Sequence, residues 1–334
     1  MEANGTGTSR RDFLKRCAAG AVALSAGEMN LLGAQQPTAV KSKVVVACDP
    51  KLRPNGTTID SGRVYSLLDR GVQNFYGVDN PLQAWKMMVR PGERVALKVN
   101  TIAGRGLSTN VQIVEAICER LQRAGVKPQD IIVFDRENRE LERAGFHLSS
   151  DAGRVRCMGT DSFGYEEQPE AFGTVRSKVS KILTRNCDVL INVPLLKDHS
   201  DAGITAAMKN MYGVVDNPYR LHDHGCAPGV ADLNMLPAIR TKLRLTICDA
   251  TTACFDGGPS FSPEGTWKYN GVIIARDPVA LDYVAWRIIE RKRAEQGLNT
   301  LRAAGREPRF IGLAADAGHQ LGTNDPSCIS LVEV

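Results

Sequence analysis

The sequence predicts one α/β domain over residues 43–334, built on a mostly parallel, doubly wound-like sheet with helices on both faces. A strand-like run at residues 93–100, a glycine-rich loop and an amphipathic helix at 111–124 follow one another, and a strand-like run at 130–135 comes next. This order is typical of the βαβ unit of a parallel sheet. With 43% hydrophobic and 24% charged residues, the chain also has enough apolar material for a large core.

The remaining elements continue this alternation. Further strands are predicted at residues 43–48, 189–193, 243–249, 271–275 and 328–334. Further helices are predicted at residues 61–76, 82–89, 177–184, 203–212, 231–240, 279–293 and 308–317. Residues 137–173 are less regular and are interpreted as a possible small insertion in the single domain.

The helix predicted at residues 203–212 places several polar side chains beside the core. Its apolar stripe is formed by Ile204, Met208, Met211 and Val215. Thr205, Lys209 and Tyr212 share the neighbouring face of that helix. Lys209 is therefore expected beside the core stripe rather than opposite it.

Composition and charge exclude two classes of function. The net charge is +5, but part of it lies near the N-terminus, the lysines and arginines are scattered, and 6% of residues are aromatic. A nucleic-acid surface combines a basic groove with stacking rings, so we expect no nucleic-acid partner. The apolar runs are too short for a bilayer, so we expect no stable membrane span. The sequence carries no signature of an oligomeric state.

Residues 1–34 are predicted to be a twin-arginine (Tat) signal segment. Residues 9–15 read SRRDFLK, a short run rich in alanine and glycine follows, and the small residues up to Ala34 form a cleavage site. This pattern predicts export by the Tat translocase to the periplasm or another extracytoplasmic compartment, with residues 35–42 as a linker. The alternative is a chance pair of arginines ahead of an amphipathic helix.

Polar side chains stand at the carboxyl ends of four predicted strands. They are Lys98 and Asn100, then Lys197, Asp198 and His199, then Asp249, and finally Asp277. Ligands of open α/β sheets bind outside the carboxyl ends of the strands, so we expect these side chains to converge in one cleft. The alternative is that they cap the following helices, and this is the preferred interpretation of Asp277, which precedes a proline at a helix start.

Four residues are predicted to be catalytic: Lys197, Asp198, His199 and Lys209. A histidine oriented by a carboxylate, with a lysine that polarises a carbonyl group, is a workable acid–base set. A lysine flanked by other cations has a lowered pKa and can act as a base or as a Schiff-base nucleophile. The alternative is a solvated loop with local ion pairs.

A second group of residues is predicted to bind the substrate. The glycine-rich loop before residue 111 leads into a helix start, which is a ready site for an anion, although a plain capped turn is the alternative. The positive side chains indicate an anionic small molecule, either a carboxylate or a phosphate ester. The predicted substrate-binding residues are Lys98, Asn100, Arg105, Ser108, Thr109, Asn210, Tyr212 and Asp249.

The alternating residues His222, His224 and Cys226 are candidate ligands of a metal ion. In an extended segment all three point to one side, which suits a tetrahedral metal. The alternative is a polar loop that closes over the site.

The nine cysteines contain no C-x-x-C pair. Cys48, Cys118, Cys187 and Cys248 lie in apolar patterns and are predicted to be buried free thiols. In an oxidising compartment the four others outside the leader have the option of one or two disulfides, whose pairing spacing alone does not give.

Several motifs together resemble the domain of unknown function 362 family. They are VALKVN, GRGLST, INVPLLKDHSDAGITAAMKNMYG, the ADLN segment after Cys226, PAIRTKLRLTICDA, GGP and RDPVALD. The resemblance covers nearly all of the chain after the leader and implies that these motifs belong to one site, but it implies no particular reaction. Some members of that family look to be associated with iron–sulfur ferredoxin modules, whereas this chain has no ferredoxin cysteine run.

Three functions remain open at this point. The first is an enzyme that uses Lys197 or His199 in acid–base chemistry on an anionic small molecule. The second is a metal- or iron–sulfur-associated redox accessory protein. The third is a non-catalytic periplasmic protein that binds an anionic ligand.

Overall fold

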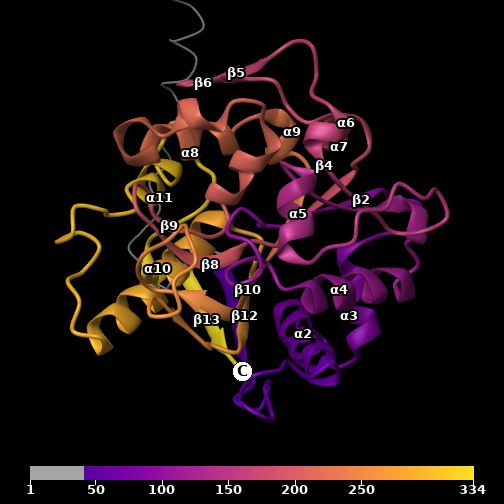
Figure 1. Ribbon diagram of the computed structural model, residues 1–334, viewed down its shortest axis with the longest axis horizontal. Helices are drawn as coiled ribbons and strands as arrows, with labels where there is room; N and C mark the ends of the chain where they lie inside the picture. Colours follow the sequence, from indigo (N-terminus) through magenta and orange to yellow (C-terminus); the bar gives the residue numbers. More distant parts are fainter. Residues whose placement is uncertain (1–40) are drawn as a thin grey trace, which may run out of the picture. The chain divides into compact units, whose positions relative to one another are not determined.

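The computed structural model describes residues 41–334 (Figure 1). The predicted signal segment and nearly all of the predicted linker lie outside these residues. The described chain folds around a mixed sheet whose main path has the order β13-β1-β12-β10-β7-β2-β3-β4. The predicted α/β class with a mostly parallel sheet is confirmed.

The strands of the main path run parallel with one exception. Strand β12 pairs antiparallel with both β1 and β10, whereas the pairs β13–β1, β10–β7, β7–β2, β2–β3 and β3–β4 are parallel. The bounds of these strands are β1 Ser42–Cys48, β2 Val95–Lys98, β3 Ile131–Asp135, β4 Arg156–Gly159, β7 Val189–Asn192, β10 Leu243–Cys254, β12 Gly271–Ala275 and β13 Ile329–Glu333.

Helices cover both faces of the sheet, as the doubly wound prediction requires (Figure 1). On β1, Val45 and Ala47 pack into one core with α2, α3 and α4, while Val44 and Val46 pack into a second core with α8, α10 and α11. This alternation is the two-residue period of a strand buried on both faces. The helices are α2 Ser61–Tyr76, α3 Pro81–Met88, α4 Val111–Arg123, α5 Asn138–Ala144, α6 Thr160–Phe163, α7 Lys181–Arg185, α8 Ala227–Asn234, α9 Pro237–Arg240, α10 Pro278–Glu295 and α11 Phe310–Ala314.

The helix predicted at residues 203–212 is wrong. Strand β8, Leu195–His199, pairs with β10 and turns back into strand β9, Gly203–Thr205, and the 3₁₀ helix η2 begins only at Lys209 and ends at Val214. Pairing with β8 outweighs the helical spacing of the apolar residues. Gly203 permits the turn because its φ is +80° and an added Cβ would lie 2.1 Å from the carbonyl oxygen of Arg306.

Residues 137–173 contain more regular structure than the sequence indicates. They hold α5, the edge strand β4 and α6, and they end at β5, Glu170–Phe172, which forms a separate hairpin with β6, Val175–Ser177. The remaining short elements are β11 Thr266–Trp267 and the 3₁₀ helices η1 Pro128–Asp130, η3 Pro218–Leu221, η4 Asp223–Cys226 and η5 Pro326–Cys328.

The eight cysteines in the described part of the chain are all free thiols. The predicted burial holds for Cys118, Cys187 and Cys248, whereas Cys48 is only half-buried. Among residues 41–334, no helix has both the length and the apolar character needed to cross a membrane.

Candidate functional site

Part of the predicted set of polar strand ends lines one cavity at the carboxyl ends of the parallel strands. Lys98 is the last residue of β2, Lys197 lies on β8 and Lys209 begins η2, and all three line one cavity of about 210 Å³. The three lysine side chains are almost fully buried, with relative exposures of 1%, 1% and 5%. Because Lys is rarely buried without a partner, the three ammonium groups are the feature that has to be explained.

A chain of asparagines runs behind the lysines. Lys197 Nζ donates to Asn100 Oδ1 at 2.8 Å, and Asn100 Nδ2 donates to Asn210 Oδ1 at 3.0 Å. Asn210 Nδ2 then donates to Asn192 Oδ1 at 2.7 Å, and Asn192 Nδ2 donates to the carbonyl oxygen of Ala207 at 2.8 Å. An ammonium group only donates and a carbonyl only accepts, so the two ends determine the orientation of every amide between them.

Lys98 is the cation of a buried ion pair. Its Nζ atom lies 2.7 Å from Oδ1 of Asp135, and it also donates to Asn210 Oδ1 at 3.2 Å. The backbone of Gly213 closes over this pair, since an added Cβ would lie 2.6 Å from Asp135 Oδ1 and 2.7 Å from Lys98 Nζ. Lys98 is therefore neutralised within the protein, and its role in the site is mainly to hold the asparagine chain.

Lys197 and Lys209 differ from Lys98 because neither pairs with a carboxylate within 4.0 Å among the described residues. Lys209 Nζ lies 3.4 Å from His222 Nε2 and 3.8 Å from the centroid of the Tyr212 ring. Burial lowers the pKa of both lysines from 10.5 to about 8, and for Lys197 the neighbouring Lys209 and Lys98 add to this effect. Each is a buried cation whose charge an anionic ligand would compensate.

The two histidines of the cavity are held in opposite tautomers. Nδ1 of His199 accepts the backbone N–H groups of Asp201 and Ala202 at 3.1 and 3.3 Å, so the proton of the neutral ring is on Nε2. Nδ1 of His222 lies 3.0 Å from the carbonyl oxygen of Pro218 and must donate to it, so its Nε2 keeps a lone pair. His199 therefore offers a donor and His222 an acceptor.

Both imidazoles are neutral near pH 7. Burial, with the positive charges of Lys209 and Lys197, holds the pKa of His199 far below its ordinary value of 6.5. Burial and Lys209 also lower the pKa of His222. The arrangement thus combines two buried ammonium groups with a neutral hydrogen-bond donor and a neutral proton acceptor.

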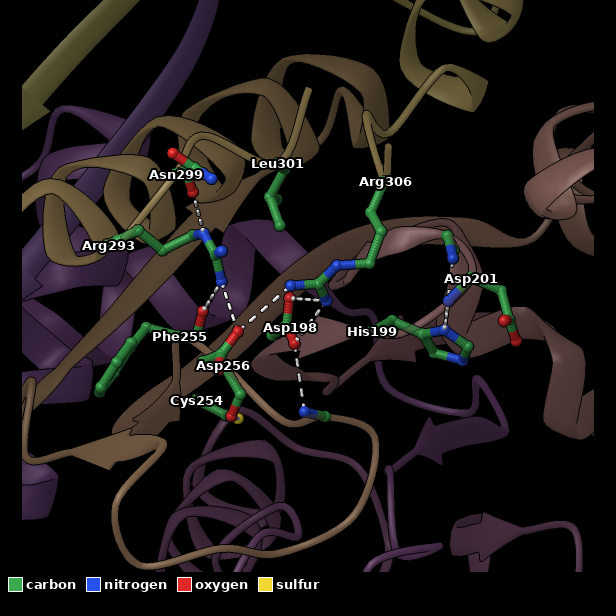
Figure 2. Close-up of polar contacts among 12 residues, drawn as sticks. Asp198, His199, Asp201, Cys254, Phe255, Asp256, Arg293, Asn299, Leu301 and Arg306 are labelled. Atoms are coloured by element: carbon green, nitrogen blue, oxygen red, sulfur yellow. Dashed lines mark hydrogen bonds and ion pairs between the residues drawn. The ribbon is translucent and has the colours of Figure 1, made fainter. Parts of the chain in front are cut away.

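Asp198 faces away from the cavity, so it does not orient His199 as predicted. Successive side chains of a strand point to opposite sides. Both carboxylate oxygens of Asp198 accept hydrogen bonds from the guanidinium group of Arg306, at 2.8 and 2.9 Å (Figure 2). Arg306 also forms an ion pair with Asp256 at 3.2 Å, and Asp256 forms a second ion pair with Arg293 at 2.7 Å. This ion network, in which Asp198 and Arg293 are buried and Asp256 is partly exposed, holds β8 on the side opposite to the cavity.

The predicted metal set of His222, His224 and Cys226 is not formed. Residues 223–226 are a 3₁₀ turn in which His224 and Cys226 have φ values of +53° and +62°, rather than an extended segment. His224 is exposed and Cys226 is fully buried, close to Lys209 and Tyr212. The structure therefore does not bring the three side chains to one point.

A different trio, His199, Asp201 and His222, has potential ligand atoms within 4.8 Å of one another. A ligating histidine normally donates the proton on its other nitrogen to an acceptor. Nδ1 of His199 faces two N–H donors, so Nε2 has to keep its proton and offers no lone pair to a metal. Only His222 has the tautomer of a metal ligand, and the nearby Lys209 cation opposes a second positive charge.

The predicted anion loop lies in a separate hollow of about 350 Å³, lined by Arg105, Ser108 and Thr109 among others. Ser108 Oγ donates to the carbonyl oxygen of Gly104, and Thr109 Oγ1 donates to that of Val193. Asp249 already occupies the start of α4, where it accepts the N–H of Asn110 at 2.7 Å. The side chains of Ser108, Thr109 and Asp249 are therefore engaged within the protein, whereas Arg105 is exposed, and none of the four lines the lysine cavity.

Asp277 lies at the opposite edge of the sheet because β12 runs antiparallel to its neighbours. Its side chain accepts the backbone N–H groups of Val279 and Ala280, so it is the helix cap that its Asp-Pro pattern indicates. Of the predicted residues, the cavity is lined by Lys98, Asn100, Lys197, His199, Lys209, Asn210, Tyr212 and His222.

Several residues of the cavity and of its supporting contacts were not identified from the sequence. Asp135 ends β3 just as Lys98 ends β2, so the pattern of polar strand ends identifies it as well. Glu140 lines the cavity from α5, and burial together with Asp135 raises the pKa of its carboxyl group. Arg306 lies in a turn more than a hundred residues from Asp198, and no local motif links the two.

Fold and site together define an α/β domain with a buried, lysine-rich cavity at the carboxyl edge of a parallel sheet. The chain belongs to the family described as domain of unknown function (DUF362), which it matches over residues 95–287. It is also 28% identical over 221 residues to the thylakoid-associated protein sll1697 of Synechocystis sp., covering 63% of this chain and 67% of that protein. The matched family region contains every cavity residue named above.

Proposed function

We propose that this protein binds an anionic small molecule, a carboxylate or a phosphate ester, in the lysine cavity and acts on it by acid–base chemistry. The observation that carries the proposal is the pair of buried ammonium groups of Lys197 and Lys209, which have no carboxylate partner within 4.0 Å in the described chain. An unpaired buried cation costs free energy, and an anionic ligand offsets that cost on binding.

The acid–base part of the proposal rests on the two histidines. The lone pair of His222 Nε2 suits a general base, and the N–H of His199 Nε2 suits a donor to a developing oxyanion. Lys209, hydrogen-bonded to His222 at 3.4 Å, is placed to exchange a proton with it. Asp198 is removed from this set and acts as a positioning residue, because its carboxylate binds Arg306.

Calorimetric titration with acetate, pyruvate, inorganic phosphate and glycerol phosphate tests the binding step. The Lys197→Met and Lys209→Met variants should bind the preferred anion about 10- to 100-fold more weakly, which corresponds to one charged hydrogen bond of about 1.5–3 kcal/mol. Lys86→Met removes an exposed lysine of α3 and is the matched control. Equal affinity in all four proteins would place the anion elsewhere.

Deuterium exchange separates an enzyme from a non-catalytic binding protein. A carboxylate ligand incubated with the protein in D₂O should exchange a carbon-bound hydrogen when His222 acts as a base, and NMR spectroscopy detects the exchange. His222→Gln should abolish the exchange while the ligand still binds. A ligand that binds tightly and exchanges no hydrogen with the wild-type protein would favour the non-catalytic alternative.

We further propose that the protein works outside the cytoplasm after Tat export. The twin-arginine pattern of residues 9–15 supports this, and the name of the Synechocystis relative associates that protein with the thylakoid. The double variant Arg10→Lys, Arg11→Lys should accumulate in the cytoplasm with its leader uncleaved. Lys15→Arg with Arg16→Lys is the control that keeps the arginine pair, and export of both double variants at the wild-type rate would contradict the proposal.

A further inference from the structure

Two large hydrophobic side chains are exposed at the mouth of the lysine cavity, beside the exposed polar residues Ser200 and Asp201. Tyr219 and Ile102 have relative exposures of 74% and 53%, the two highest values among the exposed large hydrophobic side chains of the described chain. Both line this cavity. Single exposed hydrophobic residues are normal on a protein surface, but the two most exposed ones meeting at one buried, charged cavity indicate a binding surface.

The surroundings of Tyr219 and Ile102 strengthen this pattern. Pro218 and Pro259 line the same cavity, and the guanidinium group of Arg136 lies 5.1 Å from the centroid of the Tyr219 ring. Arg136 occupies one face of that ring, and the high exposure of Tyr219 leaves other parts of the ring open to solvent. The exposed part of such a ring offers a flat apolar surface on which a ligand ring can stack.

The interior of the cavity has the opposite character. Lys197, Lys209 and the donor nitrogen of His199 are buried, so charge and hydrogen bonding are concentrated there. Ligand sites commonly combine an apolar lining with a few polar groups that set the orientation of the ligand. With Tyr219 and Ile102 exposed at the mouth and the two lysines buried inside, a ligand with an apolar part and an anionic group would be oriented with its anionic group inward.

We propose that the ligand is an anion attached to an apolar, ring-bearing body, such as an arylalkyl carboxylate or an aryl phosphate. Its anionic group would lie on Lys197 and Lys209, and its ring would lie between Tyr219 and Ile102 at the mouth. This inference rests on the proposed function, because it assumes that the two lysines bind the anion. It adds a substrate class that the lysines alone do not specify.

Calorimetric titration with matched pairs of ligands tests the inference. Acetate is compared with phenylacetate and 4-phenylbutyrate, and inorganic phosphate is compared with phenyl phosphate. The ring-bearing member of at least one pair should bind the wild-type protein about tenfold more tightly, because its ring leaves water. The Tyr219→Ser and Ile102→Ser variants should lose this preference while their affinity for acetate or inorganic phosphate stays unchanged.

Met87→Ser is the matched control, because Met87 is 49% exposed on α3 and does not line the cavity. That variant should keep the full preference for the ring. Equal affinity for both members of every pair, or a preference that survives in the Tyr219→Ser, Ile102→Ser double variant, would overturn this inference and leave the anion site standing. Failure of the wild-type protein to bind any of the five anions would overturn the inference together with the proposed function.

Discussion

The Nζ atom of Lys197 lies 2.8 Å from the Oδ1 atom of Asn100, and no carboxylate in the described chain pairs with it within 4.0 Å. The partner of Lys197 is thus a neutral amide, whereas the partner of Lys98 is the carboxylate of Asp135 at 2.7 Å. Two buried lysines of one cavity therefore have different electrostatic surroundings. The contrast between them leads to the predictions below.

Anion binding should weaken as the pH rises above about 8. The pKa values of Lys197 and Lys209 are lowered to about 8, so both lysines lose their protons as the pH passes through that value, and with them the charge that attracts the anion. Both histidine pKa values are lowered as well, so they add no transition near neutral pH. Calorimetry at pH 7, 8 and 9 measures the effect. A constant affinity over this range would show that the lysine charges are not used.

Replacement of Lys197 by Met should stabilise the fold at pH 7. Because the folded-state pKa is about 8 and the unfolded one is 10.5, holding the charge costs roughly 3 kcal/mol below pH 8. Loss of the hydrogen bond to Asn100 offsets roughly 1 kcal/mol of this gain in stability. The free energy of unfolding should therefore rise by roughly 1–2 kcal/mol.

The pH dependence provides the control for this variant. Between pH 8 and 10.5 the unfolded chain binds more protons at Lys197 than the folded chain does, so the wild-type protein gains stability with rising pH and the advantage of the variant disappears. Urea unfolding at pH 7 and pH 10 measures this change. Lys86→Met should show no such pH-dependent difference from the wild-type protein.

Removal of Arg306 should destabilise the protein strongly. Arg306→Met leaves the fully buried carboxylate of Asp198 without its cation, which typically costs about 3–5 kcal/mol. The double variant Arg306→Met, Asp198→Asn should recover part of this loss, because no charge is then buried and the amide oxygen still accepts the N–H of Gly258. Chemical denaturation compares the wild-type protein, the two single variants Arg306→Met and Asp198→Asn, and the double variant, and Arg302→Met at an exposed site should change little. Additive effects of the two substitutions would contradict the coupling.

The substitution Gly213→Ala should disrupt the Lys98–Asp135 ion pair. The new Cβ would lie 2.6 Å from Asp135 Oδ1, and overpacking of this kind costs about 1–3 kcal/mol. Gly312→Ala is the opposite case, because its Cβ meets nothing closer than 3.9 Å and it lies on α11, so it should stabilise by about 0.5–1 kcal/mol. Thermal unfolding compares the two variants, and a neutral effect at position 213 would refute the close packing.

Chelation should leave the protein unchanged. The tautomer of His199 withholds a lone pair from a metal, so treatment with EDTA should alter neither the melting temperature nor the affinity for the anion. Elemental analysis of protein isolated after export is the direct measurement. Stoichiometric zinc in the wild-type protein that is lost in His222→Gln would contradict this prediction. It would show that His199 binds the metal in spite of its two backbone hydrogen bonds.

The sequence predicts the sheet better than it predicts the site. Runs such as residues 131–135 and 271–275 form buried strands because burial in the core removes their apolar side chains from water. Polar strand ends likewise identify Lys98 and Lys197 as cavity residues. Residues 203–212 were misassigned because their spacing also fits a helix, and only the tertiary pairing of β9 with β8 decides between the two structures.

The direction of side chains escapes sequence reasoning for a similar reason. Lys197, Asp198 and His199 are consecutive, so a loop would let all three meet, whereas a strand sends Asp198 to the other side. The tautomer of His199 depends on a turn at Asp201 and Ala202, and the partner of Asp198 comes from a distant turn. These features depend on contacts between segments whose relative positions only the fold establishes.

The row of asparagines makes the cavity sensitive to deamidation. Deamidation of Asn100 or Asn210 would exchange an N–H donor for an oxygen acceptor, and the new oxygen would face the acceptor of the next residue in the row. The row cannot reverse its direction to accommodate this, because the carbonyl group of Ala207 has no proton to give. One hydrolysed amide would thus place a negative charge beside Lys197 and Lys98, where it would act as an internal counter-ion and compete with an anionic ligand for the two lysines.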